Sequence, residues 1–210
     1  MISLRTKINK FSGSIRQIRL EPANGNDPLT NLPGKILLNQ ELLRHMAANH
    51  KFSVIYVNLH KKNFTDKYCF AGGKLVTVFT SKVLIHVVKK YGKAEDFIAH
   101  IKENEFVIIT ERALADNLCR RAVKYFDSLI GLACNNLELI KNKEFRSELA
   151  GGYPFIVMSI IDIKEGEKAF LGNIINGVKH LKLDQKTNHG SIYMHESINK
   201  VKNTRHLAGI

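Results

Sequence analysis

The length, composition and charge of the chain exclude several classes of protein. Its 210 residues suffice for one hydrophobic core, and 44% hydrophobic with 24% charged residues is typical of a globular domain and not of a disordered chain. No apolar run is long enough to cross a bilayer, and the three cysteines show neither C-x-x-C nor His-paired spacing. We therefore expect a cytoplasmic, single-domain protein without a membrane span, zinc site or disulfide framework.

The excess of positive charge admits a nucleic-acid partner without requiring one. There are 32 Lys and Arg against 19 Asp and Glu, a formal charge of +13 at pH 7. Such a charge attracts phosphate backbones of any sequence. The basic residues are scattered along the chain, however, and a Lys-rich surface often serves solvation alone. Charge by itself does not decide between the two interpretations.

The first part of the chain predicts a linker, a helix and a buried strand. Residues 1–26 lack periodicity and end in turn formers, so we expect the domain to begin at Asp27. Asp27 is expected to cap a helix whose first residue is Pro28. Residues 52–59 form a β-branched apolar run that predicts a strand. The helix would carry on its apolar face Ile36, Leu37, Leu42, Leu43 and Met46.

The rest of the chain interleaves helices with strands. A helical period over residues 75–88 ends before Gly92, and the apolar runs 97–101 and 106–110 predict a β-hairpin. A strand over 153–163, a helix over 168–183 and a closing strand over 191–194 follow. Together these elements predict an α/β (α+β) sandwich in which helices cover a central sheet. The clearest helix has on one stripe Leu114, Leu118, Ala122, Phe126 and Leu129.

Short motifs along this order resemble those of one known family. Residues 27–33 read Asp-Pro-Leu-Thr-Asn-Leu-Pro, residues 102–106 read Lys-Glu-Asn-Glu-Phe, and residues 158–160 read Met-Ser-Ile. In order and spacing they resemble the D-x-L-T-x-L-P opening, the name motif and the S-I-G strand of bacterial GGDEF domains, the domains of diguanylate cyclases. The resemblance covers about residues 27–197, leaving 1–26 as a lead-in and 198–210 as a tail. It implies the nucleotidyl-cyclase-like palm fold, with a mostly antiparallel sheet.

Within this resemblance the catalytic positions are altered. In GGDEF domains two GTP-loaded domains face each other, and metal ions held by carboxylates assist attack of each 3′-hydroxyl on the partner's α-phosphate. Asn58 stands in place of the strand Asp and Asn104 in place of the hairpin's acidic residue, so Glu105 alone keeps a carboxylate that Mg²⁺ prefers. Lys102 and Glu103 replace the glycines that let the backbone approach phosphate.

The positions that the resemblance assigns to nucleotide binding are altered as well. Thr65, beside Asp66, stands where the family has Asn, and Lys74 stands where it has Asp. Lys93 and Asp96 lie at the spacing of the family's R-x-x-D product-inhibition site. Lys93 can attract a phosphate but cannot form the bidentate fork of arginine. The alternative for this pair, which we favour, is a solvated helix-to-strand loop.

Two histidines raise the question of a metal or a catalytic base. His60 and His100 lie in expected strands, without a His, Cys or carboxylate partner at ligand spacing. We therefore interpret both as structural histidines.

These observations predict a catalytically inactive GGDEF-domain protein that acts in cyclic di-GMP signalling as a protein-interaction or nucleotide-binding regulator. No catalytic residue, metal site or cofactor is expected, and Mg²⁺ would enter only with residual cyclase activity. The expected partners are a protein of this signalling system, cyclic di-GMP or GTP as effector, and a second copy in a homodimer. A weak diguanylate cyclase that uses Glu105 and Asp66, and a basic nucleic-acid-binding regulator, are the alternatives.

Overall fold

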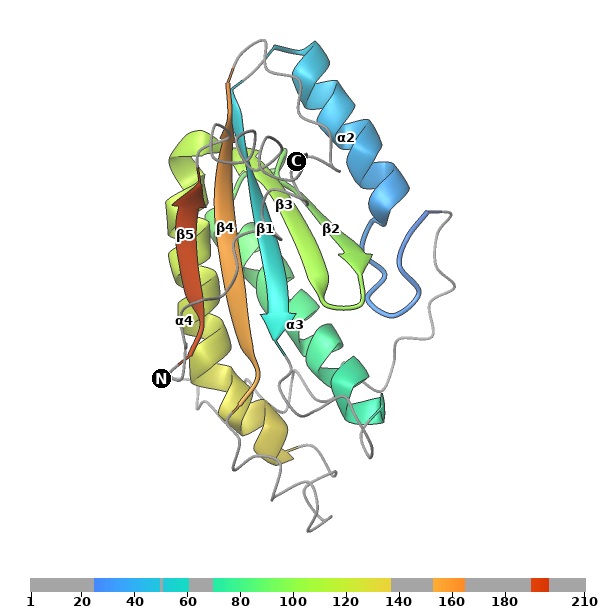
Figure 1. Ribbon diagram of the computed structural model, residues 1–210, viewed down its shortest axis with the longest axis vertical. Helices are drawn as coiled ribbons and strands as arrows, with labels where there is room; N and C mark the ends of the chain where they lie inside the picture. The colour runs from blue at the N-terminus through green and yellow to red at the C-terminus, as the bar shows by residue number, and fades with distance from the viewer. Residues whose placement is uncertain (1–24, 50, 61–69, 137–152, 165–189, 197–210) are drawn as a thin grey trace, which may run out of the picture.

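A five-stranded sheet forms the centre of the chain in the computed structural model, which describes residues 25–49, 51–60, 70–136, 153–164 and 190–196 (Figure 1). The strand order is β2-β3-β1-β4-β5. β1 lies in the middle, antiparallel to both β3 and β4, β2 is antiparallel to β3, and β5 is parallel to β4. The sheet is therefore mostly antiparallel, as predicted. The strands are β1 (Phe52–His60), β2 (Phe97–Lys102), β3 (Glu105–Glu111), β4 (Phe155–Ile163) and β5 (Ile192–Glu196).

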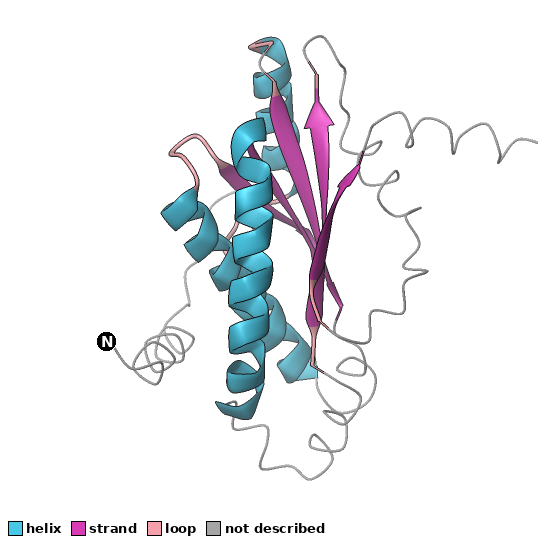
Figure 2. Cartoon of the chain, turned by 90° about the vertical axis from the view of Figure 1, so that its left-hand side faces the viewer, coloured by secondary structure: helices cyan, strands magenta, loops and turns pink. Residues whose placement is uncertain are grey.

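Helices lie on both faces of this sheet, and within the described ranges there are three of them. They are α2 (Lys35–Ala47), α3 (Phe70–Tyr91) and α4 (Arg112–Asn136). α3 and α4 pack against one face, where they share a core with alternate residues of β1, β3 and β4. α2 packs on the other face, over the intervening residues of the same strands. Figure 2 shows the strands beside the helical layer.

Alternation along β1 decides which face each of its side chains joins. Ile55, Val57 and Leu59 enter the core under α3 and α4, whereas Val54 and Tyr56 enter the core under α2. All five are buried, as expected for a central strand covered on both faces. Residue 58 consequently points to the α2 side of the sheet, near the end of the strand.

The first helix begins later than predicted, at Lys35. Asp27 does cap a turn: its Oδ1 accepts the backbone N–H groups of Leu29 at 3.0 Å and Thr30 at 2.9 Å. That turn ends at Asn31, whose φ of 57° is left-handed and incompatible with a continuing helix. The local side-chain hydrogen bonds of Asp27 thus stabilise a separate turn before the helix.

The apolar face of α2 also differs from the prediction. Leu38 and Leu42 are the residues that are buried against the sheet. Ile36 and Leu43, which we expected in the core, are 68% and 57% exposed. The helix starts seven residues after the predicted first position. The capping signal therefore could not indicate which of its side chains face the sheet.

The remaining predicted elements that fall in the described residues are confirmed, namely both hairpin strands, α3, α4, β4 and the closing strand. The predicted helix over 168–183 lies outside the described residues. Gly92 follows α3, and a Cβ there would lie 2.6 Å from the carbonyl oxygen of Val88, so a larger residue would collide. None of the described helices combines the length and apolar character needed to cross a membrane.

Candidate functional site

Several of the predicted site positions come together where β1 ends beside the turn of the β2–β3 hairpin. Asn58 of β1 lies opposite Glu105 of β3 in the antiparallel register. Paired residues of this kind have their side chains on one face with Cβ atoms about 5 Å apart. The Leu59 N–H donates to the Asn104 carbonyl oxygen at 2.8 Å, which holds the hairpin turn against the end of β1. Asn58, Asn104 and Glu105 are therefore neighbours.

Two of the three neighbouring residues at this hairpin end are neutral amides, and the third, Glu105, is a carboxylate. Asn58 is half-buried, and the side-chain oxygen of Asn104 is buried without a hydrogen-bond partner in the described residues. Tyr56, two residues before Asn58 and on the same face, is buried beside Glu105. Burial, together with the negative charge of Glu105, raises the pKa of Tyr56 well above its usual range. The phenol therefore stays neutral.

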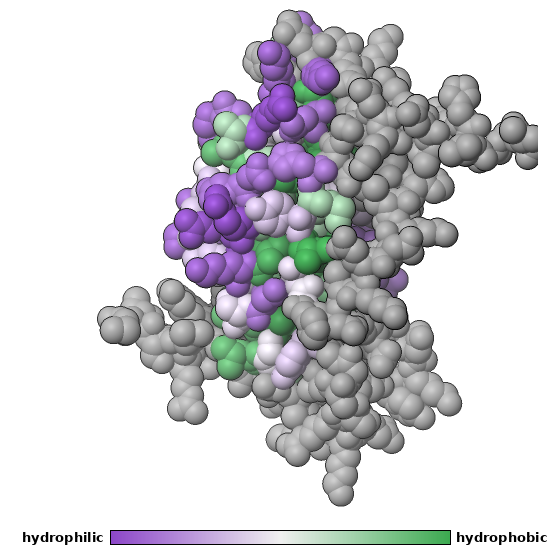
Figure 3. Space-filling view, turned by 60° about the vertical axis from the view of Figure 1, so that its left-hand side comes forward, coloured by the Kyte–Doolittle hydropathy of each residue, from purple (hydrophilic) through white to green (hydrophobic). Residues whose placement is uncertain are grey.

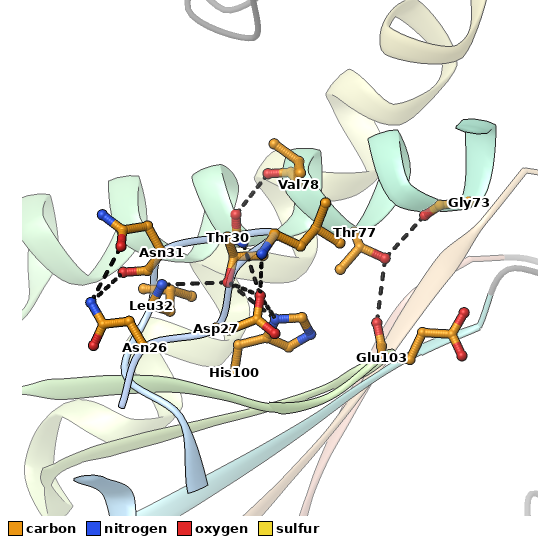
Figure 4. Close-up of polar contacts among 12 residues, drawn as sticks. Asn26, Asp27, Thr30, Asn31, Leu32, Gly73, Thr77, Val78, His100 and Glu103 are labelled. Atoms are coloured by element: carbon orange, nitrogen blue, oxygen red, sulfur yellow. Dashed lines mark hydrogen bonds and ion pairs between the residues drawn. The ribbon is translucent and has the colours of Figure 1, made fainter. Parts of the chain in front are cut away.

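The hairpin turn itself carries two side chains where the family has glycines. Lys102 and Glu103 are both exposed, and Lys102 pairs with Glu105 in the register of β2 and β3. The Thr77 hydroxyl of α3 lies 3.4 Å from the Glu103 carbonyl oxygen and braces the turn (Figure 4). Lys74, three residues earlier on α3, is exposed. The altered phosphate position and the altered base position thus belong to elements that touch.

Thr65 and Asp66, the other two predicted nucleotide-binding residues, lie outside the described residues.

Lys93 and Asp96 lie at the opposite end of the hairpin, because they precede β2 whereas the turn follows it. The Asp96 carboxylate accepts the Lys93 backbone N–H at 2.9 Å, and the Asp96 N–H donates to the Lys93 carbonyl at 3.2 Å. The Lys93 ammonium lies 2.5 Å from the Glu111 carboxylate, which raises the pKa of Lys93. Lys93 is nevertheless 56% exposed. Both side chains thus have partners within the loop or at the end of β3.

His100 has a carboxylate partner that is distant from it in the sequence. Its Nδ1 lies 2.8 Å from Asp27 Oδ1 and 3.1 Å from the Thr30 hydroxyl, and Figure 4 shows the three side chains directed toward one another. The ring stacks on Phe106 with centroids 4.4 Å apart, and its backbone N–H donates to the Pro33 carbonyl. Sequence spacing missed the pair because only the folded chain brings residue 27 beside β2. The structural interpretation of His100 stands.

His60 also packs as a core residue. Its ring stacks on Phe155 with centroids 4.8 Å apart and planes 5° apart. Burial lowers the pKa of His60, which favours the neutral imidazole. Across the described ranges, no three His, Cys, Asp or Glu side chains are grouped in a way that could hold a metal ion.

The fold of the chain can be compared with the folds of known proteins. No family model and no curated protein matches the sequence. The GGDEF domain of DgcB from Caulobacter crescentus, solved with c-di-GMP, superposes with a TM-score of 0.60 at 15% identity, over 84% of this chain and 98% of that one. The chain has the fold of a GGDEF domain.

Two structures from Pseudomonas aeruginosa agree with this assignment. The diguanylate cyclase SiaD, solved with its activator SiaC, matches 91% of this chain and 70% of its own, with a TM-score of 0.57 at 14% identity. The GGDEF domain of FimX matches 83% and 100%, with a TM-score of 0.57 at 13% identity. Identities this low show the fold alone.

Proposed function

We propose that this chain is a non-catalytic GGDEF-fold regulator in cyclic di-GMP signalling, which binds a protein partner or a nucleotide effector. The supporting observation is the hairpin end, where Asn58 lies opposite Glu105 in the register and Asn104 precedes Glu105 in the turn held by Leu59. Mg²⁺ prefers hard, anionic oxygen ligands and must neutralise developing phosphate charge. Two neutral amides leave only one carboxylate for this task.

The backbone of the turn supports the same proposal. Lys102 and Glu103 add side chains where close approach of phosphate to the backbone requires glycine. Because the turn is held on one side by Leu59 and on the other by Thr77, it cannot move aside without breaking those hydrogen bonds. Loss of charge and loss of access therefore act together against phosphoryl transfer.

The relatives support binding as the retained activity. SiaD was solved with a protein activator and DgcB with c-di-GMP. In the present chain the bound molecule would be a protein partner, a second copy of the domain or a nucleotide. The role would then depend on the preserved fold rather than on turnover.

Incubation of the purified chain with GTP and Mg²⁺ tests the loss of catalysis. We expect no cyclic di-GMP above the level of a heat-denatured sample, measured by liquid chromatography with mass detection, while an intact diguanylate cyclase gives product under the same conditions. Product that disappears in Glu105→Ala would overturn the proposal in favour of a weak cyclase. Product that persists in Glu105→Ala would come from a contaminating enzyme, and the assay would be repeated after further purification.

Calorimetric titration with cyclic di-GMP tests the effector. If the Lys93 loop is the binding site, Lys93→Ala should weaken binding about 10- to 150-fold, since a charge-assisted hydrogen bond contributes roughly 1.5–3 kcal/mol. Glu111→Gln should strengthen binding, because it releases the Lys93 ammonium from its ion pair. Lys51→Ala, which removes an exposed lysine at the start of β1, is the matched control. Equal affinities of the unaltered chain and the three variants would mean that cyclic di-GMP binds elsewhere. No detectable heat of binding would leave a protein partner as the expected ligand.

A further inference from the structure

Among the described residues, the outer surface where α3 and α4 lie side by side carries cations and tyrosines but no carboxylate. On α3 the residues at helical spacing that face outward are Lys82, His86, Lys89 and Lys90. On α4 the corresponding residues, which all precede Ser128 in the sequence, are Asn117, Arg121, Lys124 and Tyr125. We call these residues, together with Tyr91, the α3–α4 face. Figure 3, which brings the α4 side forward, shows hydrophilic side chains crowded over much of the described surface.

The two tyrosines join the helices and hold the cations in place. The hydroxyls of Tyr91 and Tyr125 lie 3.1 Å apart, and the Lys90 ammonium donates to Tyr125 at 3.3 Å. Lys90 also lies over both rings, and the Arg121 guanidinium lies 4.8 Å from the centroid of Tyr91. The ring of His86 meets the ring of Tyr125 at 64°. The positive groups are therefore ordered on aromatic surfaces that are themselves only half-buried.

Two cationic nitrogens of this face lack acceptors. The ammonium of Lys82 and the Nε of Arg121 are buried without a hydrogen-bond partner in the described part of the chain. Burial lowers the pKa of Lys82, as expected for a charge that has lost water without gaining an anion. Unpaired buried donors are costly, and because these two nitrogens are buried they lie beneath the surface that a ligand would contact. The face thus has more cationic donors than it has acceptors.

The acidic residues of α4 are turned toward a different neighbour. Asp116 pairs with His195 of β5 at 2.8 Å. The Asp127 carboxylate accepts the N–H and hydroxyl of Ser191, just before β5. The two carboxylates of α4 thus lie on its β5 side, Asp116 one turn from Arg120, whereas Arg121 and Lys124 lie on its α3 side.

We propose that the α3–α4 face binds single-stranded nucleic acid, with Lys89, Lys90 and Lys124 contacting phosphates and Tyr91 and Tyr125 contacting bases. Cations interleaved with aromatic rings are the usual means of binding single strands without sequence preference. An acidic protein would use the cations but not the rings. Residues 82 to 90 extend about 12 Å along α3, enough for a short run of nucleotides. The site is separate from the hairpin end and does not depend on the proposed function.

Fluorescence anisotropy with a labelled 12-nucleotide oligouridine tests this site in the full chain. With three or four phosphate contacts, affinity should fall about 20- to 50-fold between 50 and 200 mM salt. The double variant Lys89→Glu, Lys124→Glu should lose at least tenfold in affinity at 50 mM salt and show a shallower salt dependence. The control double variant Lys35→Glu, Lys51→Glu changes the net charge equally, at exposed positions elsewhere, and should stay within about threefold.

Three results would overturn the proposal. Equal losses in the two double variants would mean that net charge, not this face, attracts the strand. Polyglutamate that competes as well as the oligonucleotide would assign the face to acidic proteins, and a duplex that binds as tightly as the single strand would remove the role of the rings. Because all four substituted lysines are exposed, each variant should fold, and circular dichroism checks that it does.

Discussion

Replacing His100 by alanine is expected to lower the free energy of unfolding by about 3 kcal/mol. The imidazole is 3% exposed, stacks on Phe106 and lies 2.8 Å from the carboxylate of Asp27. Removal leaves a cavity in the core and takes away one partner of a half-buried carboxylate. The loss should also release the segment around Asp27 from β2, since this pair fastens the two together. Urea unfolding followed by circular dichroism measures the effect.

Two further variants separate packing from pairing. His100→Phe keeps a ring for Phe106 but removes the partner of Asp27, and Asp27→Asn removes the charge and keeps the shape. If pairing matters, His100→Phe and Asp27→Asn should each cost about 1–2 kcal/mol, and the double variant should cost less than their sum. Additive costs would show that the two residues contribute independently, contrary to the 2.8 Å contact.

The pH dependence of the stability provides a second test of the Asp27–His100 pair. Burial alone would raise the pKa of Asp27, but hydrogen bonds from the Thr30 N–H and from His100 outweigh it and lower that pKa. A lowered pKa contributes stability that is complete above the unfolded pKa, about 4, and is lost as the pH falls through the folded pKa. The difference between the unaltered chain and Asp27→Asn should therefore shrink as the pH falls below about 4. A constant difference would mean that the charge is not stabilised.

Elements with a strong period were predictable from sequence because burial follows the period. In α4, the predicted stripe residues Leu118, Ala122 and Phe126 are completely buried. In β1, a β-branched apolar run without alternation predicted a strand covered on both faces, as observed. The β2–β3 hairpin was predictable as well, from two short apolar runs separated by the polar residues 102–105, whereas the register that places Asn58 opposite Glu105 came only with the structure.

Features that depend on tertiary contact or on competing local hydrogen bonds could not be read from the sequence. The start of α2 was missed because Asp27 stabilises a separate turn that ends at Asn31. The Asp27–His100 pair was missed because its members are distant in sequence. The contacts of Asp116 and Asp127 were missed because both look like ordinary solvated residues until β5 is placed beside them. Scattered basic residues in a sequence can thus still form one face.

The double substitution Asn58→Asp, Asn104→Asp is expected to tighten Mn²⁺ binding at least about tenfold. It adds one carboxylate opposite Glu105 in the register and one at the preceding residue of the turn, and each opposite charge within a few ångströms of an ion contributes more than the 1.4 kcal/mol that a tenfold change requires. Titration of free Mn²⁺ by electron paramagnetic resonance measures the change. Asn39→Asp with Gln40→Glu, on the exposed side of α2, adds the same charge elsewhere and should have little effect. Unchanged affinity in the first variant would show that the three side chains do not converge on one ion.

The same variant distinguishes the two changes that we infer at the hairpin end, the loss of negative charge and the loss of space for phosphate. Charge is restored by the substitutions, but Lys102 and Glu103 still occupy the space that phosphate approach requires, and Leu59 and Thr77 still hold the turn. We therefore expect the variant to bind the metal and yet form no cyclic di-GMP. Product formation with the metal would mean that charge alone had been limiting. Because both amides are close in shape to the carboxylates that replace them, the comparison changes charge while leaving the packing of β1 and the hairpin nearly as it was.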